Sequence, residues 1–213
     1  MLRNMRKNKT KGNAIVEFAL AASVMIPAII GSAGVGVQLG RSIQVAQVSR
    51  DTCKMFFTGI DFTTASNQKL VGRLAYGMGL ASSSDGTINP TGNGLVVLTK
   101  VQKVGSSQCQ LGGYSNGNCP NKGLLVIVKR VAFGNTSLRQ SSFGMPPNMM
   151  IQGEGEVLAS DFADESSLVV PATAPTQYLN LTDGQYAYVT ETFFRMPSMS
   201  GFGASNSYAF NVM

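Results

Sequence analysis

The longest apolar stretch of the sequence lies near its N-terminus. No charged residue occurs between positions 18 and 40, and a helix of that length can cross a hydrocarbon layer of about 30 Å. Residues 41–57 mix apolar and polar side chains with partial helical spacing and contain neither proline nor glycine. Gly59 then provides a stop. We therefore predict one long helix, with a transmembrane part at 13–40 and an extracytoplasmic continuation at 41–58.

The pattern changes after this helix and predicts a globular head over residues 59–213. Residues 66–79 suit a short helix, and residues 81–94 have the composition of a loop. Alternating and β-branched segments predict strands near 95–104, 124–133, 186–195 and 207–212, with a further strand near 155–162. The expected fold class is α+β, in which a long N-terminal helix, transmembrane and then amphipathic, packs on a small antiparallel β-sheet.

The positive charge of the chain is concentrated at its start. The sequence has 17 basic and 11 acidic residues, and five of the basic ones lie in residues 1–12, which contain no acidic residue. The remainder is close to neutral. A basic segment beside an apolar helix marks the cytoplasmic side of a membrane, so we interpret residues 1–12 as cytoplasmic and the head as extracytoplasmic. A nucleic-acid partner is not expected.

The composition excludes several classes of active site. The sequence contains no histidine, which removes Ser-His-Asp and Cys-His catalysis and most zinc sites. The acidic residues near 161–165 lack the spacing of a calcium-binding loop, and nothing nominates them as an acid/base pair. We predict no enzymatic activity, no catalytic residue, no metal site and no cofactor.

Two of the three cysteines are close in the sequence. Cys109 and Cys119 lie between the two strands of the expected hairpin, in a stretch rich in Gly, Asn and Ser. Two cysteines without a histidine or further cysteines make a poor zinc site. In an oxidising extracytoplasmic space they are expected to form a disulfide that restrains the hairpin tip. Cys53 is then left over as a small buried hydrophobic residue.

Glu17 is an acidic residue at the edge of the apolar region. A lone carboxylate in lipid costs a few kcal/mol or takes up a proton. One interpretation places Glu17 at the level of the lipid headgroups. The other is that cleavage after Gly12 gives Asn13 a new α-amine, which pairs with the Glu17 carboxylate of an adjacent subunit.

Residues 11–18, KGNAIVEF, carry a resemblance to a known family. They resemble the processing site of the prepilins of the Tad (Flp) branch of type IV pili, and within them the TadE-like pseudopilins. The resemblance implies that Gly12 is the last leader residue and that cleavage falls before Asn13. It also implies that Glu17 and Phe18 form the recognition pair. Residues 186–197 are more loosely similar to the late β-strand of the same family.

The resemblance also implies a function and a set of partners. The chain would be a structural minor pilin or pseudopilin, assembled through its N-terminal helix into a pilus or its initiating complex. Its partners would be a prepilin peptidase, major and minor pilin subunits, and an assembly platform with its ATPase. The precursor would lie in the bacterial inner membrane with its head outside the cytoplasm, and then in an extracellular pilus or a periplasmic complex. A filament made mainly of this chain is the other possibility, although major pilins of this branch tend to be much shorter.

The second half of the apolar run contains a row of small residues. Ala28, Ser32, Gly36 and Gly40 are spaced four apart and so share one helical face. Such rows let helices approach closely in lipid, although small residues are also simply common in membrane helices. Pro27 lacks an N–H and is expected to kink or locally unwind the helix.

A secretory signal peptide is the competing interpretation of the N-terminus. Gly31, Ser32 and Ala33 supply the small residues of a cleavage site after Ala33. Cleavage there would release a protein beginning at Gly34. The chain would then be a secreted envelope domain that binds a ligand or a surface, or a singly anchored one if the segment is not cut.

Overall fold

The computed structural model describes residues 9–196 and 206–213, with side chains from Ala14 onward. Most of the basic leader, residues 1–8, lies outside the described residues. The backbone of Gly12 and Asn13 belongs to the first helix, so this helix begins within the segment that we expected to be a separate leader. No proline interrupts residues 9–13, and helix propagation across them needs only one further hydrogen bond per residue.

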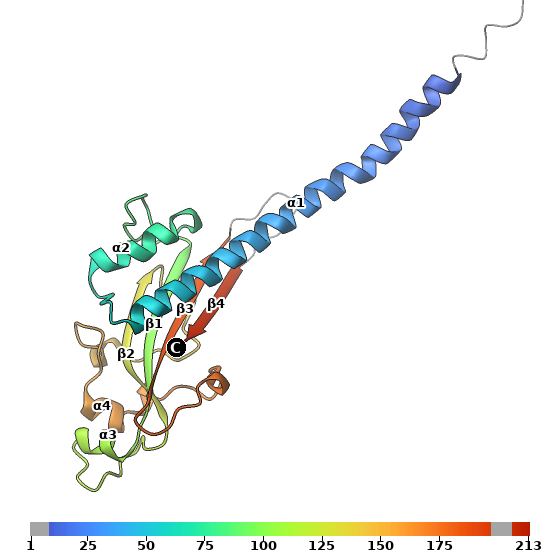
Figure 1. Ribbon diagram of the computed structural model, residues 1–213. Coiled ribbons are helices and arrows are strands. Elements are labelled where there is room, and N and C mark those ends of the chain that lie inside the picture. Colours follow the sequence, from blue (N-terminus) through green and yellow to red (C-terminus); the bar gives the residue numbers. More distant parts are fainter. Residues whose placement is uncertain (1–8, 197–205) are drawn as a thin grey trace, which may run out of the picture.

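Helix α1 runs without interruption over Lys9–Phe57 and appears in Figure 1 as one long, gently curved rod. Its helical assignment continues through Pro27. The helix is therefore not unwound at this proline, and the other form of the expectation, a kink, stays a prediction. A proline removes a single hydrogen bond of the ladder, and the intact turns on both sides hold the helix together. The helix ends at Phe57 because Gly59 adopts a left-handed conformation, with φ of 89°.

Four strands form one antiparallel sheet. They are β1 (Gly94–Lys103), β2 (Leu125–Gly134), β3 (Tyr186–Arg195) and β4 (Asn206–Val212). Their order in the sheet is β2-β1-β3-β4, and each neighbouring pair is antiparallel. Each strand begins and ends within one residue of a predicted range. The protein is thus an α+β fold in which the long N-terminal helix packs on a small antiparallel sheet.

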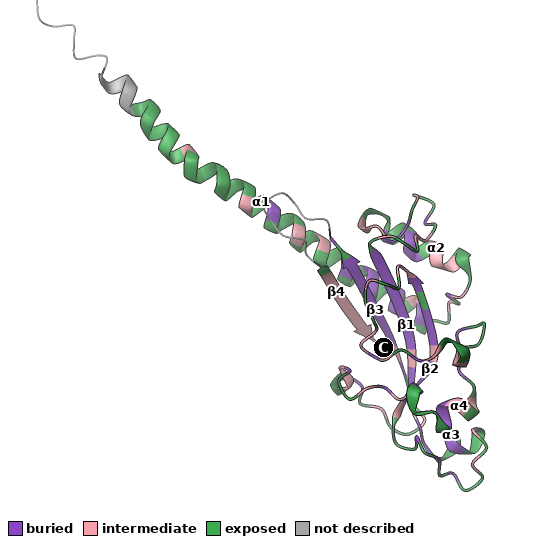
Figure 2. Cartoon of the chain, turned by 180° about the vertical axis from the view of Figure 1, so that it is seen from behind, coloured by how far each residue is buried: buried purple, intermediate pink, exposed green. Residues whose placement is uncertain are grey.

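One face of the sheet is covered by the C-terminal part of α1 and by α2 (Ala65–Leu74). Val45, Val48 and Phe56 of α1 join a core with the side chains that β1, β2 and β3 direct to this face. Figure 2 shows buried residues concentrated in β1, β2 and β3, whereas β4 has the colour of intermediate burial. The apolar stripe on the C-terminal part of α1 therefore packs against the sheet of the head.

The long connection between β2 and β3 covers the opposite face of the sheet. Phe143, Val170 and Leu179 from this connection pack on Val101 and Val189 of the strands. The connection contains helix α4 (Ala159–Asp164) and the short 3-10 helices η2 (Asn148–Met150), η3 (Ser166–Leu168) and η4 (Thr176–Tyr178).

The strand predicted near 155–162 is wrong, because α4 occupies the second half of this segment. Only an isolated bridge between Glu156 and Lys129 has strand character. Gly155 before it has a positive φ of 77°, which ends any extended run. Ala159, Ser160 and Asp161 after it are poor strand formers. Phe162 and Ala163 join the core from α4, and Val157 joins it from the residues just before this helix.

The tip of the β1–β2 hairpin forms a small lobe. It contains helix α3 (Ser106–Leu111), which the Gly- and Asn-rich sequence did not indicate. Cys109 and Cys119 form a disulfide, as predicted. Both cysteines belong to a cluster with Val126 of β2 and Phe162 of α4. The disulfide therefore joins the hairpin tip to a local apolar core.

Candidate functional site

The N-terminal half of α1 projects from the head with its apolar side chains exposed. Figure 2 shows this projecting half almost entirely in the colour of exposed residues. The exposed large apolar side chains here are Ile15, Val16, Phe18, Leu20, Val24, Met25, Ile26, Ile29, Ile30, Val35, Val37, Leu39 and Ile43. A row of this kind is far larger than the apolar patches of a soluble monomer. This half of the helix is the candidate functional site.

Burial along α1 changes near Val45, which is fully buried. From there to Phe56 the helix contacts β3 and β4. The Ser49 hydroxyl donates a hydrogen bond to the carbonyl oxygen of Thr190, at 3.4 Å, and the thiol of Cys53 faces the carbonyl oxygen of Tyr188, at 3.5 Å. One continuous helix is therefore divided into a part that the head covers and a part that it leaves uncovered.

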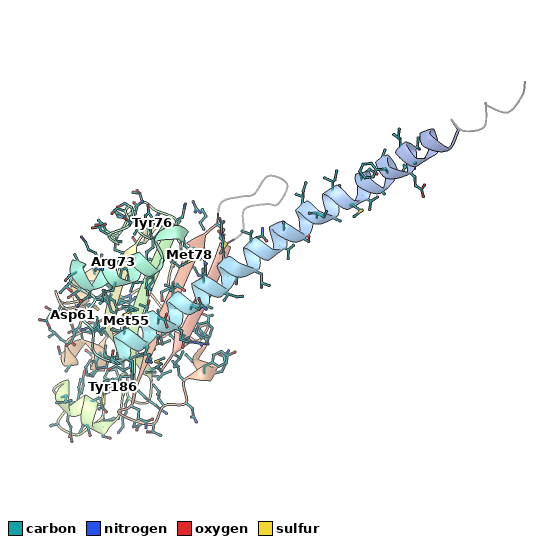
Figure 3. The ribbon with its side chains drawn as sticks, turned by 45° about the horizontal axis from the view of Figure 1, so that its top comes forward. Met55, Asp61, Arg73, Tyr76, Met78 and Tyr186 are labelled. Atoms are coloured by element: carbon teal, nitrogen blue, oxygen red, sulfur yellow. A yellow bond between two sulfur atoms is a disulfide. The ribbon has the colours of Figure 1, made fainter. Side chains whose placement is uncertain are left out.

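A groove lies between α1 and the short helix η1 (Tyr76–Met78). A cavity of about 270 Å³ is lined there by Arg41, Tyr76 and Met78, together with the residue just before β1 and the end of β3. Figure 3 labels Tyr76 and Met78 beside the helix and Met55 farther along it. The groove marks the point at which α1 leaves the head.

Glu17 and Phe18 lie in the exposed half of α1, and Phe18 is 74% exposed. Among the residues that the structure describes, Glu17 takes part in no ion pair. The side chain of Asn13 lies outside the described set, so pairing of an α-amine at this position with Glu17 stays a prediction. The Glu17 carboxylate is thus available to a group outside the described head.

The small-residue row is also uncovered. Ala28, Ser32, Gly36 and Gly40 are all exposed. A Cβ atom added at Gly36 or Gly40 would meet no described atom within 4 Å, and the Ser32 hydroxyl donates within the helix to the carbonyl oxygen of Ile29, at 2.9 Å. These glycines are therefore not required by packing against the head, which leaves this face of the helix open to a neighbour.

The alternative cleavage site lies inside the same helix. Gly31, Ser32 and Ala33 all have helical backbone. Cleavage after Ala33 would divide α1 and leave Gly34–Phe57 attached to the head. Cleavage after Gly12 would leave nearly all of α1 intact.

One helix in the described part of the chain, Ala14–Phe57, is long and apolar enough to cross a membrane. These properties of length and composition are shared by secretory signal sequences near an N-terminus. Within the described residues no group of three or more His, Cys, Asp or Glu side chains is arranged to hold a metal ion. No family model, curated protein or solved structure matches the chain.

Sequence reasoning missed a polar network on the sheet face away from α1. The buried Glu191 carboxylate accepts hydrogen bonds from the backbone N–H of Ser142, at 2.9 Å, and from the hydroxyls of Tyr208, at 2.8 Å, and Ser141. Burial is the main cause that raises the pKa of Tyr208, to about 12. The sequence signal was the position of Glu191 between Val189 and Phe193, the apolar residues that precede and follow it on the same face of β3. This network ties the β2–β3 connection and β4 to the centre of the sheet.

Proposed function

We propose that this chain is a structural, pilin-like subunit, a minor pilin or pseudopilin of a type IV pilus of the Tad (Flp) kind. The observation that carries the proposal is the division of α1 into a head-bound part and a long, exposed apolar part. A folded head would not by itself stabilise such a surface in water. The surface needs either lipid or the helices of other subunits.

The two environments suit the two stages of the proposed function. Before assembly, the apolar part of α1 spans the inner membrane, with the head on the extracytoplasmic side. On assembly, the same side chains pass from lipid to the helices of neighbouring subunits in the core of a filament or of its initiating complex. The open face at Gly36 and Gly40 supports close helix contacts.

Glu17 would form an ion pair between adjacent subunits in this assembly. After cleavage behind Gly12, the α-amine of Asn13 and the carboxylate of Glu17 are both costly to bury alone in an apolar bundle. Pairing between adjacent subunits neutralises both charges. A prepilin peptidase, the major and minor pilins, and an assembly platform with its ATPase are the partners that the proposal requires.

Identification of the N-terminus of the mature protein tests the proposal. The full chain is expressed in a host that supplies a prepilin peptidase, and the purified product is analysed by N-terminal sequencing. We expect Asn13 as the first residue. A product that begins at Gly34 would indicate secretion, and an intact Met1 would indicate an uncleaved anchor; either result would contradict the proposal.

Two matched variants make the result specific. Gly12→Leu should abolish cleavage before Asn13, because a large side chain replaces the last residue of the leader. Ala33→Leu changes the competing signal-peptide site in the same way and should leave the cleavage before Asn13 unchanged. The reverse pattern would favour the secreted envelope domain.

A further inference from the structure

A cavity of about 370 Å³ lies on the sheet face that α1 does not cover. It is bounded by β1, β2 and the first part of the β2–β3 connection. Its apolar lining residues are Leu95, Val97, Ala132, Met145, Pro146 and Ile151. This volume is within the range of small-molecule sites. Exposed Met145 and Met149 lie in the same part of the connection, and flexible methionine side chains adapt readily to a ligand.

Arg130 of β2 is a lining residue of this cavity and is only 6% exposed. Its Nη2 donates a hydrogen bond to the carbonyl oxygen of Gly144, at 2.7 Å. Its buried Nη1 has no hydrogen-bond partner among the described residues. A buried guanidinium donor without an acceptor is costly, so the site favours a ligand that brings an acceptor.

The nearest acidic group, the carboxylate of Glu191, does not supply a hydrogen-bond acceptor for Arg130 Nη1. The Glu191 carboxylate is engaged by Ser142 and Tyr208, and in the described part of the chain it forms no ion pair with Arg130 or with Arg139. Arg139 also lines the cavity, with its guanidinium carbon 3.9 Å from the ring centroid of Tyr208. The cavity thus has two guanidinium groups on its wall and an apolar floor.

Burial lowers the pKa of Arg130, although only to about 10. The side chain is therefore charged at neutral pH, when its Nη1 is a cationic donor. Guanidinium groups match the two oxygens of a carboxylate, and such charge-assisted hydrogen bonds are the strong ones.

We propose that this cavity is a binding site for a small amphipathic monocarboxylate. The carboxylate accepts from Arg130 Nη1 and pairs with Arg139, while an apolar body lies against Leu95, Val97 and Ala132. A free phosphate has the charge but lacks the body that the apolar floor would bury. This site is independent of the proposed assembly through α1, so each can fail without the other.

Methionine methyl NMR on the full chain in detergent micelles tests the site. The protein carries isotope-labelled methionine methyl groups, and the probe is phenylbutyrate. We expect a saturable shift of the Met145 methyl signal. The uncharged isostere phenylbutyramide should bind at least about ten-fold more weakly, because a carboxylate-guanidinium hydrogen bond is lost. Inorganic phosphate should bind at least about ten-fold more weakly too, because it buries no apolar surface.

Two variants and a control complete the experiment. Arg130→Gln should weaken phenylbutyrate binding at least about ten-fold. Ala132→Phe fills the cavity from its exposed floor, touches no hydrogen bond, and should abolish the shift even if Arg130→Gln does not fold. Lys122→Gln removes an exposed positive charge elsewhere and should leave binding unchanged. Absence of a saturable shift, equal affinity for phenylbutyramide or for phosphate, or binding that survives Ala132→Phe would overturn the proposal.

Discussion

Phe56 of α1 meets Tyr188 of β3 edge to face, with ring centroids 5.2 Å apart and planes inclined by 82°. Phe57 contacts the same ring at 5.4 Å. The two phenylalanines differ in burial, because Phe56 is 3% exposed and Phe57 is 55% exposed. This contact holds the end of the long helix on the sheet, and the remainder of α1 takes its direction from the part held there.

Phe56→Ala is expected to lower the free energy of unfolding of the head by about 3–4 kcal/mol, because a buried aromatic side chain is replaced by a cavity. Phe57→Ala is the matched control and should cost about 1 kcal/mol, since half of its side chain already faces solvent. Urea unfolding followed by circular dichroism measures both. Equal losses in the two variants would show that Phe56 does not fasten the helix to the sheet.

Removal of the disulfide is expected to weaken the hairpin tip more than the rest of the head. Cys109 and Cys119 are ten positions apart, and closing a loop of this length contributes about 2–3 kcal/mol. The double replacement by serine should lower the free energy of unfolding by about this amount. It should also increase amide hydrogen exchange in α3 before it does so in β3.

Cys53→Ala is the control for the disulfide, since this cysteine is free and is buried on the side of α1 that faces the sheet. Its effect should appear in the contacts of α1 with β3 rather than at the hairpin tip. Unchanged exchange in α3 after loss of the disulfide would contradict the local role that we assign to it.

The fold could be predicted from the sequence where the pattern was long or strongly alternating. The strand near 95–104 alternates from Leu98 onward, and the strand near 124–133 is β-branched and apolar, which are both patterns of strands. The long helix was indicated by the uncharged run after Glu17. Pro27 does not interrupt the helical assignment, because a single proline weakens a helix locally, whereas the turns on each side decide whether the helix continues.

Other features depend on contacts that no local pattern records. The second half of the segment near 155–162 is helical, and its Phe162 packs in the core of the hairpin lobe. The cavity beside Arg130 arises from residues of β1, β2 and the β2–β3 connection that are far apart in the sequence. Glu17 could be nominated from spacing alone, because the residues of its motif follow one another along one helix, whereas its role stays a prediction.

Tyr208 is expected to make the stability of the head depend on alkaline pH. Its pKa is raised to about 12, against an ordinary value of about 10, because burial disfavours the tyrosinate. The stabilisation is present in full below pH about 10 and is lost as the pH rises to about 12. A rise of this size corresponds to at most about 2.7 kcal/mol, which solvent around the half-buried ring reduces to about 1 kcal/mol.

Tyr208→Phe isolates this effect. At pH 7 the variant should be less stable by about 1–2 kcal/mol, because Glu191 loses a hydrogen-bond donor. The difference in free energy of unfolding between the two proteins should narrow from pH 10 to pH 12, because the tyrosine of the unfolded wild type ionises in this range while the folded form keeps its proton. Arg130 is present in both proteins, so the opposite effect of its lowered pKa cancels in the comparison. A gap that is constant up to pH 12 would contradict the assignment.

Glu17→Ala is expected to reduce pilus assembly or leader processing strongly while the head remains folded. The variant removes the carboxylate that would neutralise the α-amine of Asn13 in a neighbouring subunit, and an unpaired charge in an apolar bundle costs several kcal/mol. Glu17 lies far along α1 from the head, in the part that contacts no strand. Electron microscopy and N-terminal sequencing measure assembly and processing, and head folding is followed by circular dichroism.

Glu154→Ala is the matched control for Glu17, because it removes an exposed carboxylate from the head and should leave assembly unchanged.

Comparison of two further Glu17 variants separates the effect of the charge from the effect of side-chain shape. If the carboxylate acts as a charge, Glu17→Gln should fail as Glu17→Ala does, although glutamine keeps the size and the hydrogen-bonding capacity of the side chain. If Glu17→Asp assembles partly, the charge is sufficient and its reach sets the efficiency. Normal assembly of the Glu17→Ala variant would contradict the proposed pair between the Asn13 amine and the Glu17 carboxylate. It would instead place Glu17 at the level of the lipid headgroups. The proposed role of α1 as the assembly helix does not depend on this pair.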